Sequence, residues 1–183
     1  MSTTPAASRG DLTVDGLDLT LLPSDGPVPV APVLNAVRAT VSPNGFRVVV
    51  SAAVAEANGR APVNLTLKRA DLIDGGLQVV ARASKGPFGS DVGARVLLSV
   101  VDGRLLRADL VEVDAPKWVP VDTMIEVALK QAGGLVEPIP GETRSFLVDP
   151  VRLLSSSGVP GDLAPGGVWS VDATPQGLTL AFG

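Results

Sequence analysis

The feature that most constrains the fold of this chain is a turn signal that recurs five times along it. In each copy a polar residue precedes a glycine, and a run rich in Leu, Val or Phe follows. Polar–Gly pairs suit the positive φ angles of tight hairpin turns. Apolar residues at every second position then share one face of a strand. The pattern predicts antiparallel strands joined by turns, in segments that begin at Thr13, Ser42, Leu72, Ser99 and Thr174.

Strand signals account for most of the chain. The alternation is strongest over 40–113, and two further strands, 168–173 and 178–182, close the sequence. A short strand is expected near 143–147. Because proline is favoured in the first turn of a helix, a short helix is expected to begin at Pro32. This order of strands and helices predicts an α+β fold with a mostly antiparallel sheet.

Two later segments change to helical spacing. Over 121–132 the apolar residues recur three and four positions apart, which predicts the main amphipathic helix. Asp122 or Thr123 can cap its start, and a pair of glycines follows its end. A shorter helix is expected over 149–158, with an aspartate as its cap, a proline in its first turn and a glycine at its end.

Composition limits what the core and any site can contain. The 183 residues include no Cys, no His and no Tyr, and only 3% are aromatic while 45% are hydrophobic. Val, Leu and Ala must therefore fill the interior. Without His or Cys, the chain cannot form the usual zinc sites, a cysteine nucleophile or a histidine acid–base pair. The net charge of −4 argues against a nucleic-acid partner.

The two ends and the hydropathy pattern give further expectations. Residues 1–10 are expected to be disordered, and 11–183 to form a single domain. No apolar run reaches the 18 residues typical of a transmembrane helix, so no transmembrane segment is expected. The start of the chain lacks the apolar core of a secretory signal, which favours a cytoplasmic location. Peripheral contact with a membrane stays open.

The carboxylates provide one candidate for chemistry. Glu112 and Asp114 would share one face of a strand, as a pair of metal ligands can. Two carboxylates without further ligands are more typical of a solvated strand edge. Asp74 and Asp102 belong to the turn signals, and the serines at 155–157 have no histidine to act as a base. We therefore expect neither an enzyme nor a cofactor.

Several stretches together resemble the tubular lipid-binding (TULIP) superfamily, particularly its small bacterial members. They are the strand runs at 42–50, 61–81 and 94–113, the helix at 118–134 and the ending at 149–182. The resemblance implies a strongly curved antiparallel sheet wrapped around one main helix, with a shorter helix beside it. It also implies non-catalytic binding of a lipid or another apolar ligand in an aliphatic groove.

The candidate groove residues are aliphatic side chains expected to face inward from the strands and the main helix. Each methylene of a ligand buried there would contribute about 0.8 kcal/mol. The same side chains also suit a filled core, and the chain would then be a structural or interaction protein that pairs through a sheet edge or apolar patch, for example as a homodimer. The candidates are Leu34, Val37, Val48, Leu65, Leu67, Leu77, Val79, Leu98, Val100, Leu110, Met124, Ile125, Ala128, Leu129, Leu178 and Leu180, with Trp118 at the rim.

Overall fold

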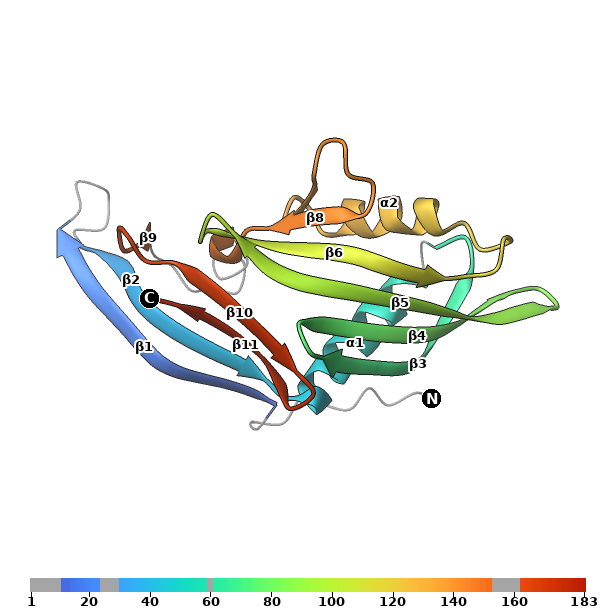
Figure 1. The fold of residues 1–183 in the computed structure, drawn as a ribbon, viewed down its shortest axis with the longest axis horizontal. Helices are drawn as coiled ribbons and strands as arrows, with labels where there is room; N and C mark the ends of the chain where they lie inside the picture. Colours follow the sequence, from blue (N-terminus) through green and yellow to red (C-terminus); the bar gives the residue numbers. More distant parts are fainter. Residues whose placement is uncertain (1–10, 24–29, 59–60, 153–161) are drawn as a thin grey trace.

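The computed structural model describes residues 11–23, 30–58, 61–152 and 162–183. Within these ranges the strands form two sheets, with helices beside them (Figure 1). The predicted α+β class and the mostly antiparallel pairing are confirmed. Neither sheet is strongly curled, so the wrapping of one curved sheet around a helix is not confirmed. Residues 1–10, for which disorder is predicted, lie outside the described residues.

The small sheet contains both ends of the described chain. Its strands follow the order β1-β2-β11-β10 with antiparallel pairing, and β9 pairs in parallel with β2. The edge strand β1 is therefore joined to the rest of the sheet through β2. The strands are β1 (Leu12–Pro23), β2 (Val30–Val41), β9 (Asp162–Leu163), β10 (Trp169–Thr174) and β11 (Gly177–Phe182).

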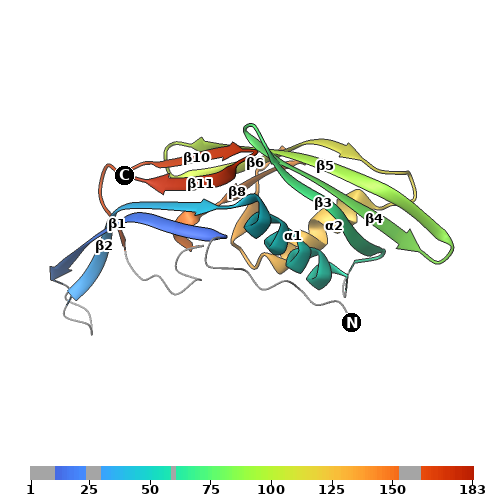
Figure 2. The ribbon, with the colours of Figure 1, turned by 90° about the horizontal axis from the view of Figure 1, so that it is seen from below.

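The large sheet is formed by the middle of the chain. Its order is β3-β4-β5-β6-β8-β7, and every neighbouring pair is antiparallel. Both α1 and α2 lie on one side of this sheet (Figure 2). The strands are β3 (Asn64–Ile73), β4 (Gly76–Lys85), β5 (Phe88–Val101), β6 (Leu105–Asp114), β7 (Val136–Pro138) and β8 (Ser145–Val148).

Three of the predicted turns join neighbouring strands. Gly75, with a φ of 73°, completes the turn between β3 and β4. At the turn between β5 and β6 both Asp102 and Gly103 have positive φ, 53° and 64°, as a type I′ hairpin turn requires. Residues 175–176 form the turn between β10 and β11. These three hairpins are confirmed. They can be predicted from the sequence because the backbone angles of a turn depend on the turn residues themselves.

The strand predicted after Ser42 is wrong, because this segment forms helix α1 (Pro43–Ala57). The Ser42 hydroxyl accepts a hydrogen bond from the Gly45 N–H at 3.0 Å and so caps the helix. Alternating valines imitate a strand, yet Phe46 and Val50 also lie one helical turn apart. Both pack in the cluster between α1 and the sheets. Burial of this helical face therefore outweighs the β propensity of the valines.

The short helix predicted from Pro32 is also wrong, because this segment is part of β2. Leu34 and Val37 are three residues apart, as on a helix, and both are buried in one cluster. The register between β1 and β2 shifts after the pair Asp18–Ala36. An extra residue at such a bulge returns the side chains on either side of it to the same face of the strand. A bulge thus imitates helical spacing here.

A second predicted turn, at Asp15-Gly16, instead lies within β1. Gly16 has a φ of 63° and falls where the register between β1 and β2 shifts. A glycine with positive φ inside a strand is typical of a β-bulge. The polar–Gly pair thus includes a glycine with positive φ, but here this angle kinks a strand instead of ending it.

The two later helices begin where the sequence predicts them. α2 (Val121–Gln131) confirms the main amphipathic helix, and Gly133 and Gly134 follow it with positive φ. The predicted side-chain cap is wrong, since Pro120 occupies the cap position and makes no side-chain hydrogen bond there. In the shorter helix, Asp149 accepts a hydrogen bond from the Val151 N–H at 2.9 Å, as predicted. Its predicted end at residue 158 lies outside the described residues.

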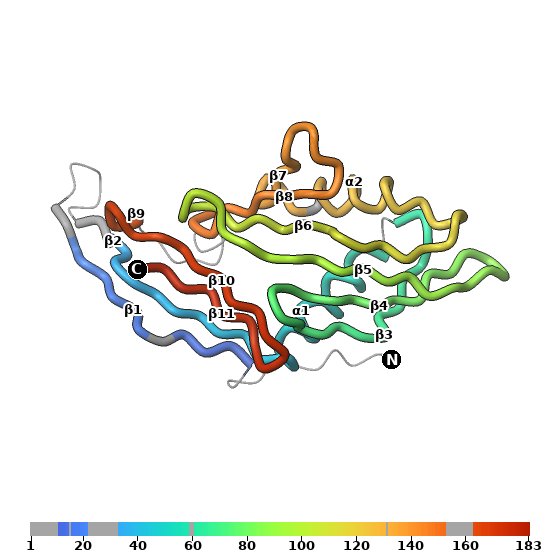
Figure 3. Tube along the Cα trace, in the orientation of Figure 1, coloured from blue at the N-terminus to red at the C-terminus, as the bar shows by residue number. Residues whose placement is uncertain are grey.

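The two sheets meet along β10, which runs past the turns of the large sheet (Figure 3). The Gly75 N–H donates to the Ala173 carbonyl at 2.9 Å, and the Trp169 N–H donates to the Gly103 carbonyl at 2.7 Å. Beneath this contact the rings of Trp169 and Phe182 lie 5.2 Å apart. The hairpin turns of one sheet thus form the docking edge for the other.

Candidate functional site

Most of the predicted groove residues are distributed over three separate packed clusters and do not line one common groove. Leu34, Val37, Val100 and Leu180 surround Trp169 and Phe182, where the sheets meet. A second group packs around Phe46 and contains Leu67, Leu77, Val79 and Leu178. A third group packs around Val63, Ala83 and Val119 and contains Leu65, Trp118 and Met124.

Most of these side chains are only half-buried. Leu34 and Val37 are buried, at 4% and 7% exposed, and Ala128 is exposed. The remaining candidates fall between these limits, including Val48 on α1 and both Leu98 and Leu110 on the large sheet. The aliphatic side of the large sheet is therefore incompletely covered by its helices.

Three of the predicted residues do line a pocket. Ile125, Ala128 and Leu129 project from α2 toward a space of about 210 Å³ beside β7 and β8. Val136 of β7 and Phe146 of β8 complete its lining, with Ala132 at the end of the helix. Every lining side chain is apolar. The spacing of the helix stripe predicts the α2 side of this pocket, whereas Val136 and Phe146 belong to short strands and were not predicted.

Strand pairing positions Phe146 in this pocket. The register pairs Phe146 with Ala108 of β6 on one side and with Pro138 of β7 on the other. Residues paired across an antiparallel ladder point to the same face, and the next residue along each strand points to the opposite face. Phe146 thus reaches the side of the sheet on which α2 lies, and Leu147 points away from it.

A second hollow of about 410 Å³ adjoins the pocket and has a different character. It shares Ile125, Leu129 and Phe146 with the apolar pocket. Its remaining lining is largely polar and includes Asp122, Glu126, Glu142, Thr143 and Arg144. The two spaces together offer an apolar end and a charged end along one helix.

A polar cluster holds β8 against β6 on the opposite face of the sheet. The Arg107 Nε atom donates to both carboxylate oxygens of Asp109, at 2.9 and 3.0 Å. Its Nη2 atom donates to Glu142 at 2.5 Å and to the Ser145 hydroxyl at 3.4 Å. These contacts tie the loop after β7, and the start of β8, to the centre of the sheet.

The same contacts shift two pKa values within this cluster. The Ser145 hydroxyl, and then the Arg107 guanidinium, hold the pKa of Asp109 below its ordinary value against the opposing effect of burial. The hydrogen bond to Asp109 likewise raises the pKa of Arg107. Both groups are therefore fixed in their charged forms at neutral pH. This arrangement stabilises the sheet and does not produce a group that exchanges protons near neutrality.

A further hollow, of about 530 Å³, lies at the junction of the two sheets. Trp169 and Phe182 line it together with charged residues of the β5–β6 turn and Asp149. The Trp169 indole nitrogen is buried and has no hydrogen-bond partner in the described structure. Unlike the pocket beside α2, this space has charged groups of both signs in its wall, among them Asp102 and Arg104.

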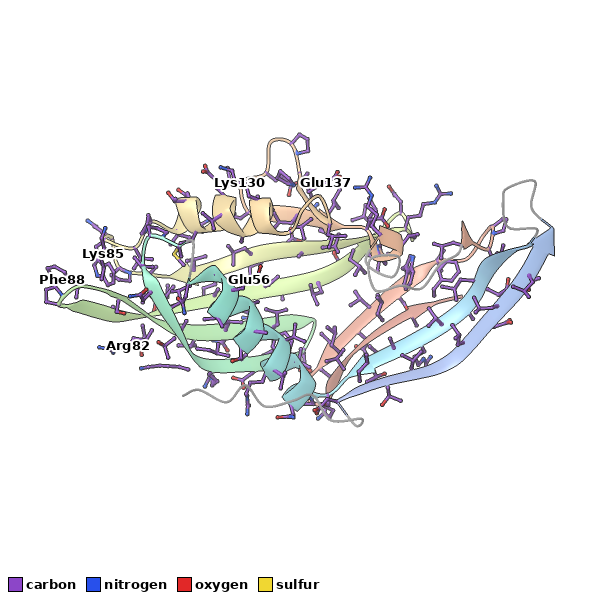
Figure 4. All side chains as sticks on the ribbon, turned by 180° about the vertical axis from the view of Figure 1, so that it is seen from behind. Glu56, Arg82, Lys85, Phe88, Lys130 and Glu137 are labelled. Atoms are coloured by element: carbon purple, nitrogen blue, oxygen red, sulfur yellow. The ribbon has the colours of Figure 1, made fainter. Side chains whose placement is uncertain are left out.

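Other candidates for chemistry are not assembled into a site. Glu112 and Asp114 are exposed at the end of β6. Across the described ranges, no group of three or more His, Cys, Asp or Glu residues lies close enough to hold a metal ion. Trp118, the predicted rim residue, is half-buried, and its ring centroid lies 6.5 Å from that of Phe88. Phe88 is 66% exposed at the tip of the β4–β5 hairpin (Figure 4).

Comparisons with known proteins do not identify a family for this chain. No family model, no curated protein and no solved structure matches it. In the part of the chain that the structure describes, no helix combines the length and apolar character needed to span a bilayer.

Proposed function

We propose that this protein binds a lipid or another apolar ligand, without catalysis, in the pocket between α2 and strands β7 and β8. The observation that carries this proposal is the lining of the pocket, in which all six side chains are apolar. Apolar concave sites with polar groups at one end are the usual form of small-molecule sites. The resemblance to the TULIP superfamily supports the same class of ligand.

The size of the pocket limits which part of a ligand it can hold. A volume of about 210 Å³ is smaller than the roughly 300–1,000 Å³ of most small-molecule pockets. It therefore takes a short apolar group or a segment of an acyl chain. A longer chain would continue over the half-buried aliphatic side of the large sheet, where each further buried methylene adds about 0.8 kcal/mol. Closure of a more curved sheet around such a chain stays a prediction.

The adjoining hollow supports an amphiphilic ligand over a purely apolar one. It opens from Ile125, Leu129 and Phe146 toward Glu126 and Arg144. In our proposal the tail occupies the apolar pocket and a polar head lies among these charged side chains, where it keeps its hydrogen bonds. Contact with a membrane surface and a cytoplasmic location remain predictions from the sequence.

Filling the pocket tests the proposal. The Ala128→Phe variant places a ring in the space that the ligand would occupy. We expect the wild type to bind a dansylated fatty acid, and we expect this variant to bind it at least about tenfold more weakly, which corresponds to 1.4 kcal/mol. Fluorescence titration measures both affinities.

The matched control is Ala55→Phe, since Ala55 is exposed on α1 and lies opposite the side that carries Phe46. This variant should bind the probe as the wild type does. Failure of the wild type to bind the probe, or equal binding by the two Phe variants, would contradict the proposed site. Lipid analysis of the purified protein provides a second measurement that does not depend on the probe.

A further inference from the structure

The edge strand β1 presents an unusual row of apolar side chains to solvent. In the described part of the chain, β1 pairs with β2 and with no other strand. Five of its residues are between 43% and 64% exposed, and they are Leu12, Val14, Leu17, Leu19 and Leu21. A long apolar edge strand is a template for pairing with another strand, and an apolar patch of this kind marks an interaction surface.

The exposed side chains extend the apolar face of the small sheet. The register pairs Val14 with Ala39 and Leu19 with Leu34, and paired residues point to the same face. The register shifts after Asp15. As a result, the apolar side chains of β1 stand at even-numbered positions before the shift and at odd-numbered positions after it.

This change of parity favours a second copy of β1 as the partner strand. A regular strand can pair with both halves of β1 only by leaving the extra residue at the bulge unpaired, as β2 does between Asp15 and Asp18. A second copy of β1 that runs antiparallel has its own extra residue at the same place, so the two strands match residue for residue. The two-fold axis would pass between Gly16 and Leu17. In this register Leu12 lies opposite Leu21 of the second copy, Thr13 opposite Thr20, and Val14 opposite Leu19.

We propose that two copies of this chain associate through their β1 strands. Antiparallel pairing of a strand with its own copy is two-fold symmetric, which is the commonest symmetry of homodimers. It satisfies the free backbone groups of both edges and joins the two small sheets into one continuous sheet. It also brings the exposed leucines of the two copies side by side.

Light scattering and sedimentation of the full chain test the association. The wild type is expected at twice the chain mass of 18.6 kDa. Val14→Lys places a charge opposite Leu19 of the second copy, within the paired apolar faces, and should give the monomer. Val111→Lys is the matched control and should stay dimeric, because Val111 is also a strand valine and is 50% exposed, against 52% for Val14.

A disulfide test measures the register directly, since the chain has no cysteine of its own. The double variant Thr13→Cys/Thr20→Cys should form disulfides between two copies under mild oxidation, and each single variant should not. The two positions of one copy lie seven residues apart, roughly 23 Å along a strand, so they cannot bridge each other. Any of three results would overturn the proposal: the wild type is a monomer, the dimer is unaffected by Val14→Lys, or the double cysteine variant forms no crosslinks. None of these results depends on an apolar ligand.

Discussion

At the scale of single residues, Gly76 shows how closely two backbones approach in the large sheet. It is buried at the start of β4, and a Cβ atom added there would lie 2.0 Å from the Val96 carbonyl oxygen. A backbone atom cannot move aside as a flexible side chain does. Glycine is therefore needed at this position for space and not for a positive φ.

We expect Gly76→Ala to lower the free energy of unfolding by about 1–3 kcal/mol, the usual range for overpacking. Gly93→Ala is the control, because a Cβ atom there would lie 3.7 Å from its nearest neighbour, in ordinary contact. Urea denaturation of both variants measures the difference. Equal losses for the two variants would show that close approach at Gly76 is not the cause.

At the scale of elements, the short strand β8 depends on the charged cluster on β6. Its residues Ser145 and Phe146 face opposite sides of the sheet, so the contacts of Ser145 with Arg107 and Asp109 hold Phe146 toward the pocket. The stabilisation requires the ionised form of Asp109. Since the pKa of this carboxyl lies below its ordinary value of 3.8, folding favours loss of its proton.

This linkage predicts a particular pH dependence. The stabilisation by Asp109 is complete above its ordinary pKa and is lost as the pH falls through its lower pKa in the folded protein. Asp109→Asn should therefore destabilise the protein at neutral pH, and its difference from the wild type should shrink below about pH 4. Asp172→Asn is the control, because the structure describes no ion pair for this exposed residue.

Denaturation curves at several pH values measure the two differences. The expected result is a difference that closes at acid pH for Asp109→Asn and a small difference throughout for Asp172→Asn. A loss for Asp109→Asn that is the same at pH 7 and at pH 3 would show that its charge is not what stabilises β8.

At the scale of the whole molecule, Phe46 joins α1 to both sheets. Its ring is 7% exposed, and the cluster around it contains Ala70 and Leu72 of the large sheet together with Val41 and Leu178 of the small sheet. Truncation of a buried aromatic ring removes contacts and leaves a cavity. The loss should therefore affect the association of the sheets as well as the docking of the helix.

Phe46→Ala is expected to cost about 3–5 kcal/mol of unfolding free energy, the range for buried aromatic rings. Phe88→Ala should cost roughly 1 kcal/mol or less, because Phe88 is 66% exposed. Thermal or urea unfolding compares the two. Similar costs for both variants would show that Phe46 does not serve as the shared core residue.

The candidate site could be predicted in part. Ile125, Ala128 and Leu129 were recognised because a helix stripe is a local pattern, and they do line the pocket beside α2. Val136 and Phe146 could not be recognised, because β7 and β8 are short and gain their positions by pairing with distant strands. A pocket needs both walls, so its location depends on contacts far apart in the sequence.

The sequence by itself determined the hairpins at Gly75 and Gly103 and the helix over 121–131, since their turn angles and helical spacing are properties of neighbouring residues. Only the tertiary structure decided that 43–57 is a helix and that the strands divide into two sheets. Within 43–57 the aliphatic residues fit both the two-residue spacing of a strand and the spacing of a helix. Which of the two structures forms depends on the apolar surface that can bury its side chains, and that surface comes from other parts of the chain.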